Sequence, residues 1–185
     1  MRWDDRSGRT ILAMAATAIV MAFEDAEPAV YRWRRAHTTD GAEGMPAHVT
    51  LIYPFAEDSD LVTGQVSELR ELLSAFPAFD VRFATFGRFD GPPPVLYLEP
   101  APAQPFIDMV DAVVRQFPSY QPFGGEYDTV IPHLTVVQTD DQAVVAAAEE
   151  DVAEHLPLVA RAGDVRVMEH DRSEGWRTLH LIRLS

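Results

Sequence analysis

The chain has 185 residues and a mass of 20.6 kDa, which fits one sizeable domain or two small lobes that share a cleft. An apolar fraction of 47% and a charged fraction of 24% exclude a wholly disordered chain or a membrane bundle, and the absence of cysteine excludes disulfides and thiolate chemistry. The formal net charge is −14 and every basic residue is arginine, so the summed field opposes binding of long nucleic acids but leaves a small phosphorylated ligand possible.

An apolar run near the N-terminus, Ile11 to Phe23, is too short to span a bilayer. Asp4 and Asp5 precede it and no polar cleavage region follows, which makes it a poor signal peptide. We therefore expect a buried strand over Thr17–Phe23, an N-terminal extension over residues 1–16, and a cytoplasmic protein.

Beyond this strand, short β-like runs alternate with amphipathic helical windows, which predicts an α/β or α+β fold. In the first half we expect a helix over Glu27–His37, a strand over Ala47–Phe55, a helix over Leu61–Phe76 and a strand over Phe79–Phe89. A Gly-Pro turn then favours an antiparallel hairpin with a strand over Val95–Glu99.

The second half repeats this pattern. We expect a helix over Phe106–Phe117, a loop over residues 119–130, a strand over Ile131–Gln138, a helix over Asp140–His155 and a strand pair over Asp164–His170 and Arg177–Leu184. The spacing from His48 to Val81 is 33 residues and that from His133 to Val165 is 32. Matched spacing suggests an internal duplication, although the same alternation also recurs by chance in α/β chains.

The two halves carry the same short motif at the same place. The first reads His48-Val-Thr50-Leu and the second reads His133-Leu-Thr135-Val. Fewer than about one sequence of this composition in a hundred would carry two such matches by chance. On a strand, each histidine shares a face with the threonine two residues later, while the apolar residues point to the other face.

Such a pair suits phosphodiester chemistry. One neutral imidazole can act as general base while a protonated one acts as general acid. Two threonine hydroxyls can donate hydrogen bonds to the non-bridging oxygens. In-line displacement at phosphorus needs the two proton-transfer groups on opposite sides, which two facing strands provide.

The segments Pro46–Phe55 (Pro-Ala-His-Val-Thr-Leu-Ile-Tyr-Pro-Phe) and Ile131–Val136 (Ile-Pro-His-Leu-Thr-Val) resemble the two-histidine phosphoesterase superfamily. The closest resemblance is to its bacterial branch of 2′-5′ RNA ligases and RNA 2′,3′-cyclic phosphodiesterases, over roughly residues 17–184. It implies an α+β fold of two pseudo-twofold lobes, with antiparallel sheets lining a central cleft and helices outside. It also implies a single domain over residues 17–185 whose lobes exchange near the 89–95 turn.

The resemblance further implies the chemistry of the site. His48 and His133 would be the catalytic pair, Thr50 and Thr135 would bind the substrate, and no metal or other cofactor would take part. In the cyclic phosphodiesterase direction, His133 would be the base on water and His48 the acid. The roles would reverse in ligation.

Composition narrows the substrate. Lysine is absent and no basic stripe with interleaved aromatics appears. Arg32, Arg34 and Arg35 are interpreted as the solvated side of a helix. We expect a small phosphodiester or cyclic nucleotide as the partner, with an RNA 3′ end as the larger alternative, and neither long nucleic acid nor membrane.

Two tyrosines are further candidates for substrate binding. Tyr53, five residues after His48, either stacks on a nucleobase or packs in the core. Tyr127 belongs to a glycine-containing loop before the second motif, together with Tyr120 and Phe123. This loop is expected to be either a mobile segment at the mouth of the cleft or an ordinary surface loop.

Other charged residues have simpler interpretations. Arg82 and Arg88 either reach the phosphate or lie on a solvated sheet face. The remaining histidines lack a threonine partner and are expected at helix ends or on the surface: His37, His155, His170 and His180. For His180, entry into the cleft is the alternative. A metal site built on the two motif histidines would lack a third ligand at short spacing. The main alternative to an enzyme is a non-catalytic module that binds nucleotides or RNA ends.

Overall fold

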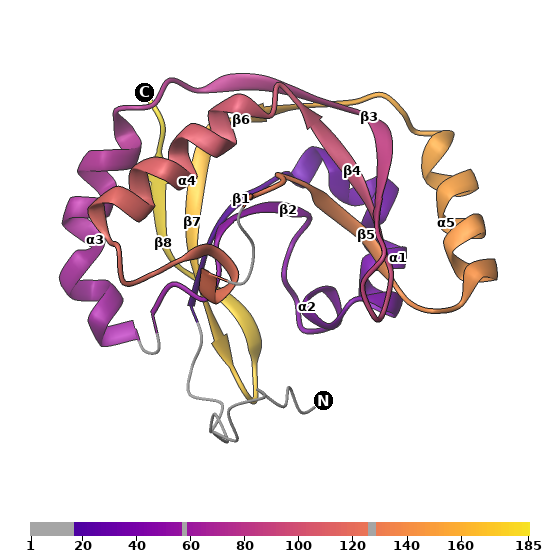
Figure 1. The fold of residues 1–185 in the computed structure, drawn as a ribbon, viewed down its shortest axis with the longest axis horizontal. Helices are drawn as coiled ribbons and strands as arrows, with labels where there is room; N and C mark the ends of the chain where they lie inside the picture. The colour runs from indigo at the N-terminus through magenta and orange to yellow at the C-terminus, as the bar shows by residue number, and fades with distance from the viewer. Residues whose placement is uncertain (1–16, 57–58, 126–128) are drawn as a thin grey trace.

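The computed structural model describes residues 17–56, 59–125 and 129–185 (Figure 1). Within these residues the chain forms two antiparallel four-stranded sheets with helices packed around them, which confirms the α+β fold. The first sheet has the order β2-β1-β7-β8 and consists of β1 (Thr17–Ala22), β2 (His48–Ile52), β7 (Asp164–Asp171) and β8 (Gly175–Arg183). The second sheet has the order β5-β4-β3-β6 and consists of β3 (Phe79–Phe89), β4 (Val95–Ala101), β5 (Leu134–Gln138) and β6 (Leu158–Ala162).

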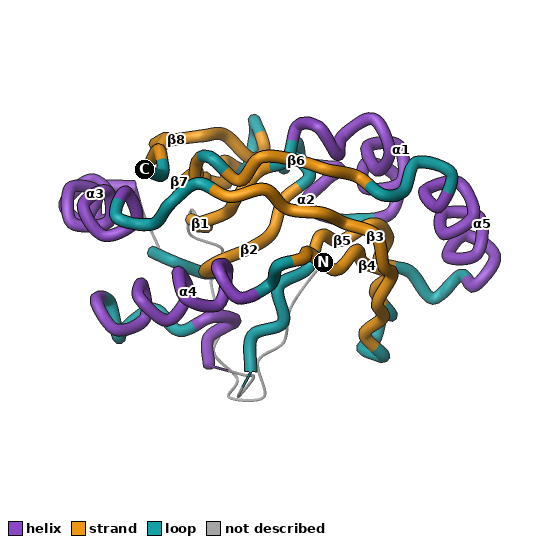
Figure 2. The backbone as a smooth tube through the Cα atoms, turned by 90° about the horizontal axis from the view of Figure 1, so that it is seen from above, coloured by secondary structure: helices purple, strands orange, loops and turns teal. Residues whose placement is uncertain are grey.

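Helices α1, α3, α4 and α5 lie toward the two ends of the molecule, and the short helix α2 contacts α1 (Figure 1). Helices α3 and α4 contact each other at one end, and α1 and α5 contact each other at the other end (Figures 1 and 2). Their bounds are α1 (Glu27–His37), α2 (Thr39–Ala42), α3 (Ser59–Ser74), α4 (Gln104–Gln116) and α5 (Gln142–Ala153), with short 3₁₀ helices at Glu24–Ala26 and Pro122–Gly125. Within the described residues, no helix is both long and apolar enough to cross a membrane.

The two halves of the chain exchange elements. Strand β3 follows the helices of the first half but pairs with β4, while β7 from the second half pairs with β1. Helix α1, which connects β1 to β2, packs on β5 of the other sheet, and α4, which connects β4 to β5, packs on β2. The edge strands β2 and β5 also contact each other. The segments that carry the two histidine motifs therefore meet at the centre of the molecule.

Strand β1 is buried on both faces. Ile19 and Met21 point into the main core, whereas Ala18 and Val20 pack in a smaller cluster with Met45 and its neighbours. A strand that buries both faces needs a continuous apolar run rather than an alternating one. This burial explains the apolar run near the N-terminus and confirms the expected strand.

Several expected boundaries differ from the observed ones. Strand β2 ends at Ile52 instead of Phe55, and β5 begins at Leu134, so that His133 precedes the strand. Helix α2 and strand β6 were not expected at all. Each is only four or five residues long, which is too short for a hydrophobic period to stand out.

Gly175 joins the β7–β8 hairpin to the loop before β2. It has φ +79°, and a Cβ there would lie 2.2 Å from the carbonyl oxygen of Glu43. We expect Gly175→Ala to destabilise the protein by about 2–3 kcal/mol in urea unfolding, because both the backbone conformation and the contact are lost. Gly64→Ala, in α3 with no atom within 4 Å of its Cβ, should instead be neutral or stabilising by about 0.5–1 kcal/mol. Equal effects of the two variants would contradict this explanation.

Candidate active site

The two histidine–threonine motifs lie at the facing edge strands β2 and β5. His48 is the first residue of β2 and Thr50 follows on the same strand, while His133 directly precedes β5 and Thr135 lies within it. His48 is buried, and the other three side chains are partly exposed. The structure therefore brings together the four residues that the sequence singled out.

Both imidazole rings are anchored in the same way. The Nδ1 atom of His48 lies 2.7 Å from the carbonyl oxygen of Pro46, and Nδ1 of His133 lies 2.7 Å from that of Ile131. A carbonyl oxygen can only accept, so Nδ1 carries the hydrogen in each ring and Nε2 is the free basic atom of the neutral form. In His48 this Nε2 lies 3.1 Å from the Thr50 hydroxyl.

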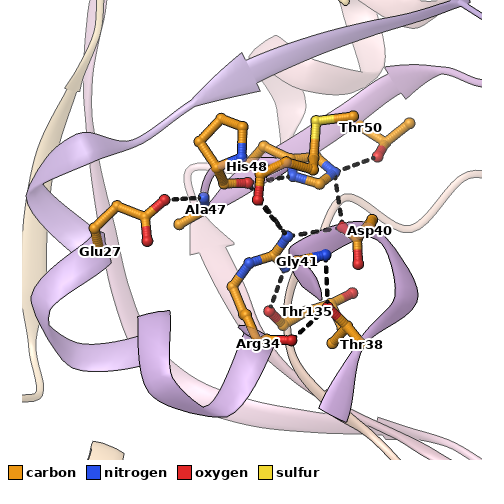
Figure 3. Close-up of polar contacts among 11 residues, drawn as sticks. Glu27, Arg34, Thr38, Asp40, Gly41, Ala47, His48, Thr50 and Thr135 are labelled. Carbon is orange, nitrogen blue, oxygen red and sulfur yellow. Dashed lines mark hydrogen bonds and ion pairs between the residues drawn. The ribbon is translucent and has the colours of Figure 1, made fainter. Parts of the chain in front are cut away.

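A buried arginine connects the two motifs (Figure 3). Arg34 on α1 is 1% exposed. Its Nη1 donates to the carbonyl oxygen of Thr135 at 2.8 Å, and its Nη2 lies 2.7 Å from Asp40 Oδ2 and 3.2 Å from the carbonyl oxygen of Pro46. The same Pro46 oxygen accepts from His48. One guanidinium thus holds the backbone beside both histidines.

Asp40 completes the group around His48. Its Oδ2 lies 2.7 Å from Arg34 Nη2 and 4.0 Å from His48 Nε2. The residue belongs to the one-turn helix α2, whose first turn is capped by the Thr38 hydroxyl accepting from the backbone N–H of Gly41 at 3.0 Å. A Cβ at Gly41 would lie 2.6 Å from this hydroxyl. The glycine is therefore required for the tight turn that places Asp40.

The surroundings change the acidity of these groups. Burial on its own would raise the pKa of Asp40, but the Arg34 guanidinium, His48 and Thr38 outweigh it and lower that pKa to about 2. Burial and then the Arg34 charge lower the pKa of His48 to about 4, against the opposing effect of Asp40. Burial also lowers the pKa of His133, opposed by the Ile131 carbonyl and Asp40.

Aromatic rings line the His133 side of the site. The His133 ring centroid is 4.9 Å from that of Phe89 and 5.3 Å from that of Tyr97, and the two aromatic rings stack at 4.3 Å. Tyr97 is opposite Thr135 in the β4–β5 register. A Cβ at Gly87 would lie 2.3 Å from the Tyr97 ring, so this glycine makes room for the stack.

The other predicted binding residues have different fates. Tyr53 is 39% exposed, so the prediction that it packs in the core is wrong. Its ring centroid lies 6.1 Å from that of Trp176. Tyr127 lies outside the described residues. Tyr120 packs against Phe55, with ring centroids 4.7 Å apart, and lies beside the core.

The arginines also need correction. Interpreting Arg34 as part of a solvated helix side is wrong, because α1 turns it toward β5 and β2. Arg32 and Arg35 are exposed as expected. Arg88 pairs with Glu149 and Arg82 is exposed, so both lie on a solvated sheet face.

Of the additional histidines, His37 and His170 have partners of their own. His37 stacks on Trp33 at a helix end, and His170 pairs with Glu43 at 2.9 Å. His155 is exposed and His180 is partly exposed on β8. In the part of the chain that the structure describes, no group of three or more histidine or carboxylate side chains is arranged to hold a metal ion.

The fold and the facing motifs define a class: two-lobed α+β proteins with a histidine–threonine pair on each central edge strand. A family model described as the 2′-5′ RNA ligase superfamily matches residues 22–174. The chain belongs to this superfamily, which confirms the resemblance found in the sequence.

Curated relatives are distant. "Putative phosphoesterase GK0864" of Geobacillus kaustophilus is 28% identical over 93 residues, which cover 50% of this chain and 51% of that protein. A Bacillus licheniformis protein with the same description is 28% identical over 104 residues, covering 53% of this chain and 57% of its own. The matched segments thus span little more than half the length of these relatives.

Solved structures share the fold. Escherichia coli LigT complexed with 3′-AMP has a TM-score of 0.62 at 14% identity, covering 92% of this chain and 98% of LigT. LigT complexed with NADP+ has a TM-score of 0.59 at 15% identity, covering 93% and 98%. TT0787 of Thermus thermophilus has a TM-score of 0.62 at 12% identity, covering 91% and 97%.

Proposed function

We propose that this protein is a metal-independent phosphoesterase that hydrolyses a 2′,3′-cyclic phosphate or a related small phosphodiester. His48 and His133 form the acid–base pair, and Thr50 and Thr135 donate hydrogen bonds to the non-bridging phosphate oxygens. The observation that carries the proposal is the matched anchoring of both rings, each held through Nδ1 by a backbone carbonyl two residues earlier. Matched anchoring on facing strands leaves two Nε2 atoms as proton-transfer groups.

Electrostatics favour a small substrate. A net charge of −14 without lysine disfavours a long polyanion. Among the exposed arginines, Arg32 pairs with Asp151 and Arg88 pairs with Glu149. Binding a single phosphodiester needs less positive charge than binding a long polyanion. Neutral hydroxyls, one imidazolium and the field of a buried guanidinium can supply it. LigT has been crystallised with 3′-AMP, ATP and phosphate, which supports a nucleotide-sized ligand.

The direct test is turnover of 2′,3′-cyclic AMP by the full chain in EDTA, with products separated by chromatography. We expect hydrolysis to a phosphomonoester that is unchanged by EDTA, with a bell-shaped pH profile set by two histidines. Loss of turnover in EDTA would exclude the metal-independent mechanism. Calorimetric binding of nucleotides without turnover would instead favour a binding module, and joining of RNA ends would favour a ligase.

A further inference from the structure

The proposed acid–base pair leaves open which histidine carries the proton before reaction. Family resemblance gives His133 as base and His48 as acid. The two rings, however, have unlike surroundings. The structure therefore offers its own criterion: the imidazolium will reside where a positive charge is better accommodated.

The surroundings of His48 oppose a positive charge. The ring is buried and shares the Pro46 carbonyl oxygen with the Arg34 guanidinium, at 2.7 Å from His48 Nδ1 and 3.2 Å from Arg34 Nη2. Two cations on one carbonyl in a dehydrated site repel each other. Asp40 compensates only in part, because the same Oδ2 is 2.7 Å from Arg34 but 4.0 Å from His48 Nε2.

The surroundings of His133 oppose a positive charge less strongly than those of His48. This ring is partly exposed and has the Phe89 and Tyr97 rings at 4.9 and 5.3 Å. Its partial exposure leaves the charged form better hydrated than that of the buried His48. Asp40 also favours the charged form of His133. The Arg34 guanidinium contacts the β5 backbone at the Thr135 carbonyl rather than next to this ring.

We infer that buried Arg34 sets the division of labour, keeping His48 neutral as the general base and leaving the proton on His133 as the general acid. This inference rests on the proposed function. Water gives a proton to His48 Nε2 while its oxygen bonds to phosphorus. The bond from phosphorus to the ribose oxygen breaks, and that oxygen takes the proton from His133 Nε2. Asp40, 4.0 Å from His48 Nε2, then offsets part of the Arg34 repulsion on the imidazolium formed there.

Arg34 is thus a positioning residue rather than a catalytic one. Its effect can be read without any turnover, by NMR titration of the two imidazoles in the resting protein. We expect His48 to stay neutral down to a lower pH than His133. Arg34→Gln should raise the pKa of His48, while Arg35→Gln, one residue further on an exposed position, should leave it unchanged. A His48 that protonates at higher pH than His133 in the wild-type protein would overturn the inference.

Leaving groups provide the kinetic test. A p-nitrophenyl phosphodiester needs no protonation of its leaving oxygen, so it should rescue a variant that lacks the acid but not one that lacks the base. We expect His133→Ala to lose about 10²–10⁴-fold on 2′,3′-cyclic AMP but less than about 10-fold on the aryl ester. His48→Ala should lose activity on both. The opposite pattern would overturn the inference, whereas a wild-type protein inactive on both substrates would refute the proposed function itself.

Discussion

Replacing either central histidine should nearly abolish turnover. We expect His48→Ala and His133→Ala each to lower kcat/KM for 2′,3′-cyclic AMP by about 10²–10⁴-fold, because each removes one proton-transfer group. The double variant should lose little more than the worse single one, since the two residues act as a unit. Steady-state kinetics of the four proteins measure this.

A matched control comes from the turn that follows helix α5 (Gln142–Ala153). His155→Ala removes an exposed imidazole and should change kcat/KM less than about 2-fold, with an unchanged urea midpoint. If the single variants at positions 48 and 133 kept full activity, the histidine pair would have no part in the chemistry.

The largest effect on stability is expected at Arg34. Arg34→Met removes the side chain that bonds Asp40 and the carbonyls of Pro46 and Thr135, and leaves the partly exposed Asp40 carboxylate without its cation. Breaking a fully buried ion pair costs about 3–5 kcal/mol of unfolding free energy. We expect a loss at the lower end of that range here, because only the guanidinium is buried. Urea denaturation measures the loss, and Arg34→Met with Asp40→Leu should recover part of it because no lone charge remains.

An exposed ion pair serves as the comparison. Arg161 and Asp80 lie 2.8 Å apart with side chains 58% and 79% exposed, so Arg161→Met should cost less than about 1 kcal/mol. An equally small cost for Arg34→Met would mean that Arg34 does not hold the two motifs together.

Much of the fold follows from local patterns. The alternation of strands and amphipathic helices predicted the class, and β3 matches its expected bounds of Phe79–Phe89. Apolar stripes and prolines mark the helices, because the side chains that a helix buries and the prolines that end it are all set within a few residues of sequence. Helix α2 lacked such a signal, since one turn around Gly41 buries too little to create a period.

The site was predicted where residues repeat and missed where they do not. His48, Thr50, His133 and Thr135 stood out because the same spacing occurs twice. Arg34 and Asp40 have no counterpart in the second motif, and their segment also holds two other arginines and a loop of mixed composition. Helical periodicity could not separate Arg34 from Arg32 and Arg35, because its partner surface is formed by β5, about a hundred residues later in the chain.

The sequence by itself determined that two like histidine motifs exist, that they lie on or beside strands, and that the chain is acidic and free of lysine and cysteine. The tertiary structure alone decided that α1 crosses to the sheet of the other half and carries Arg34 with it. The reason is physical. Alternation and composition reflect interactions between residues that are close in the chain. The electrostatic field at His48, in contrast, is set by the Arg34 guanidinium and the Asp40 carboxylate, which only the packing of α1 and α2 brings beside it.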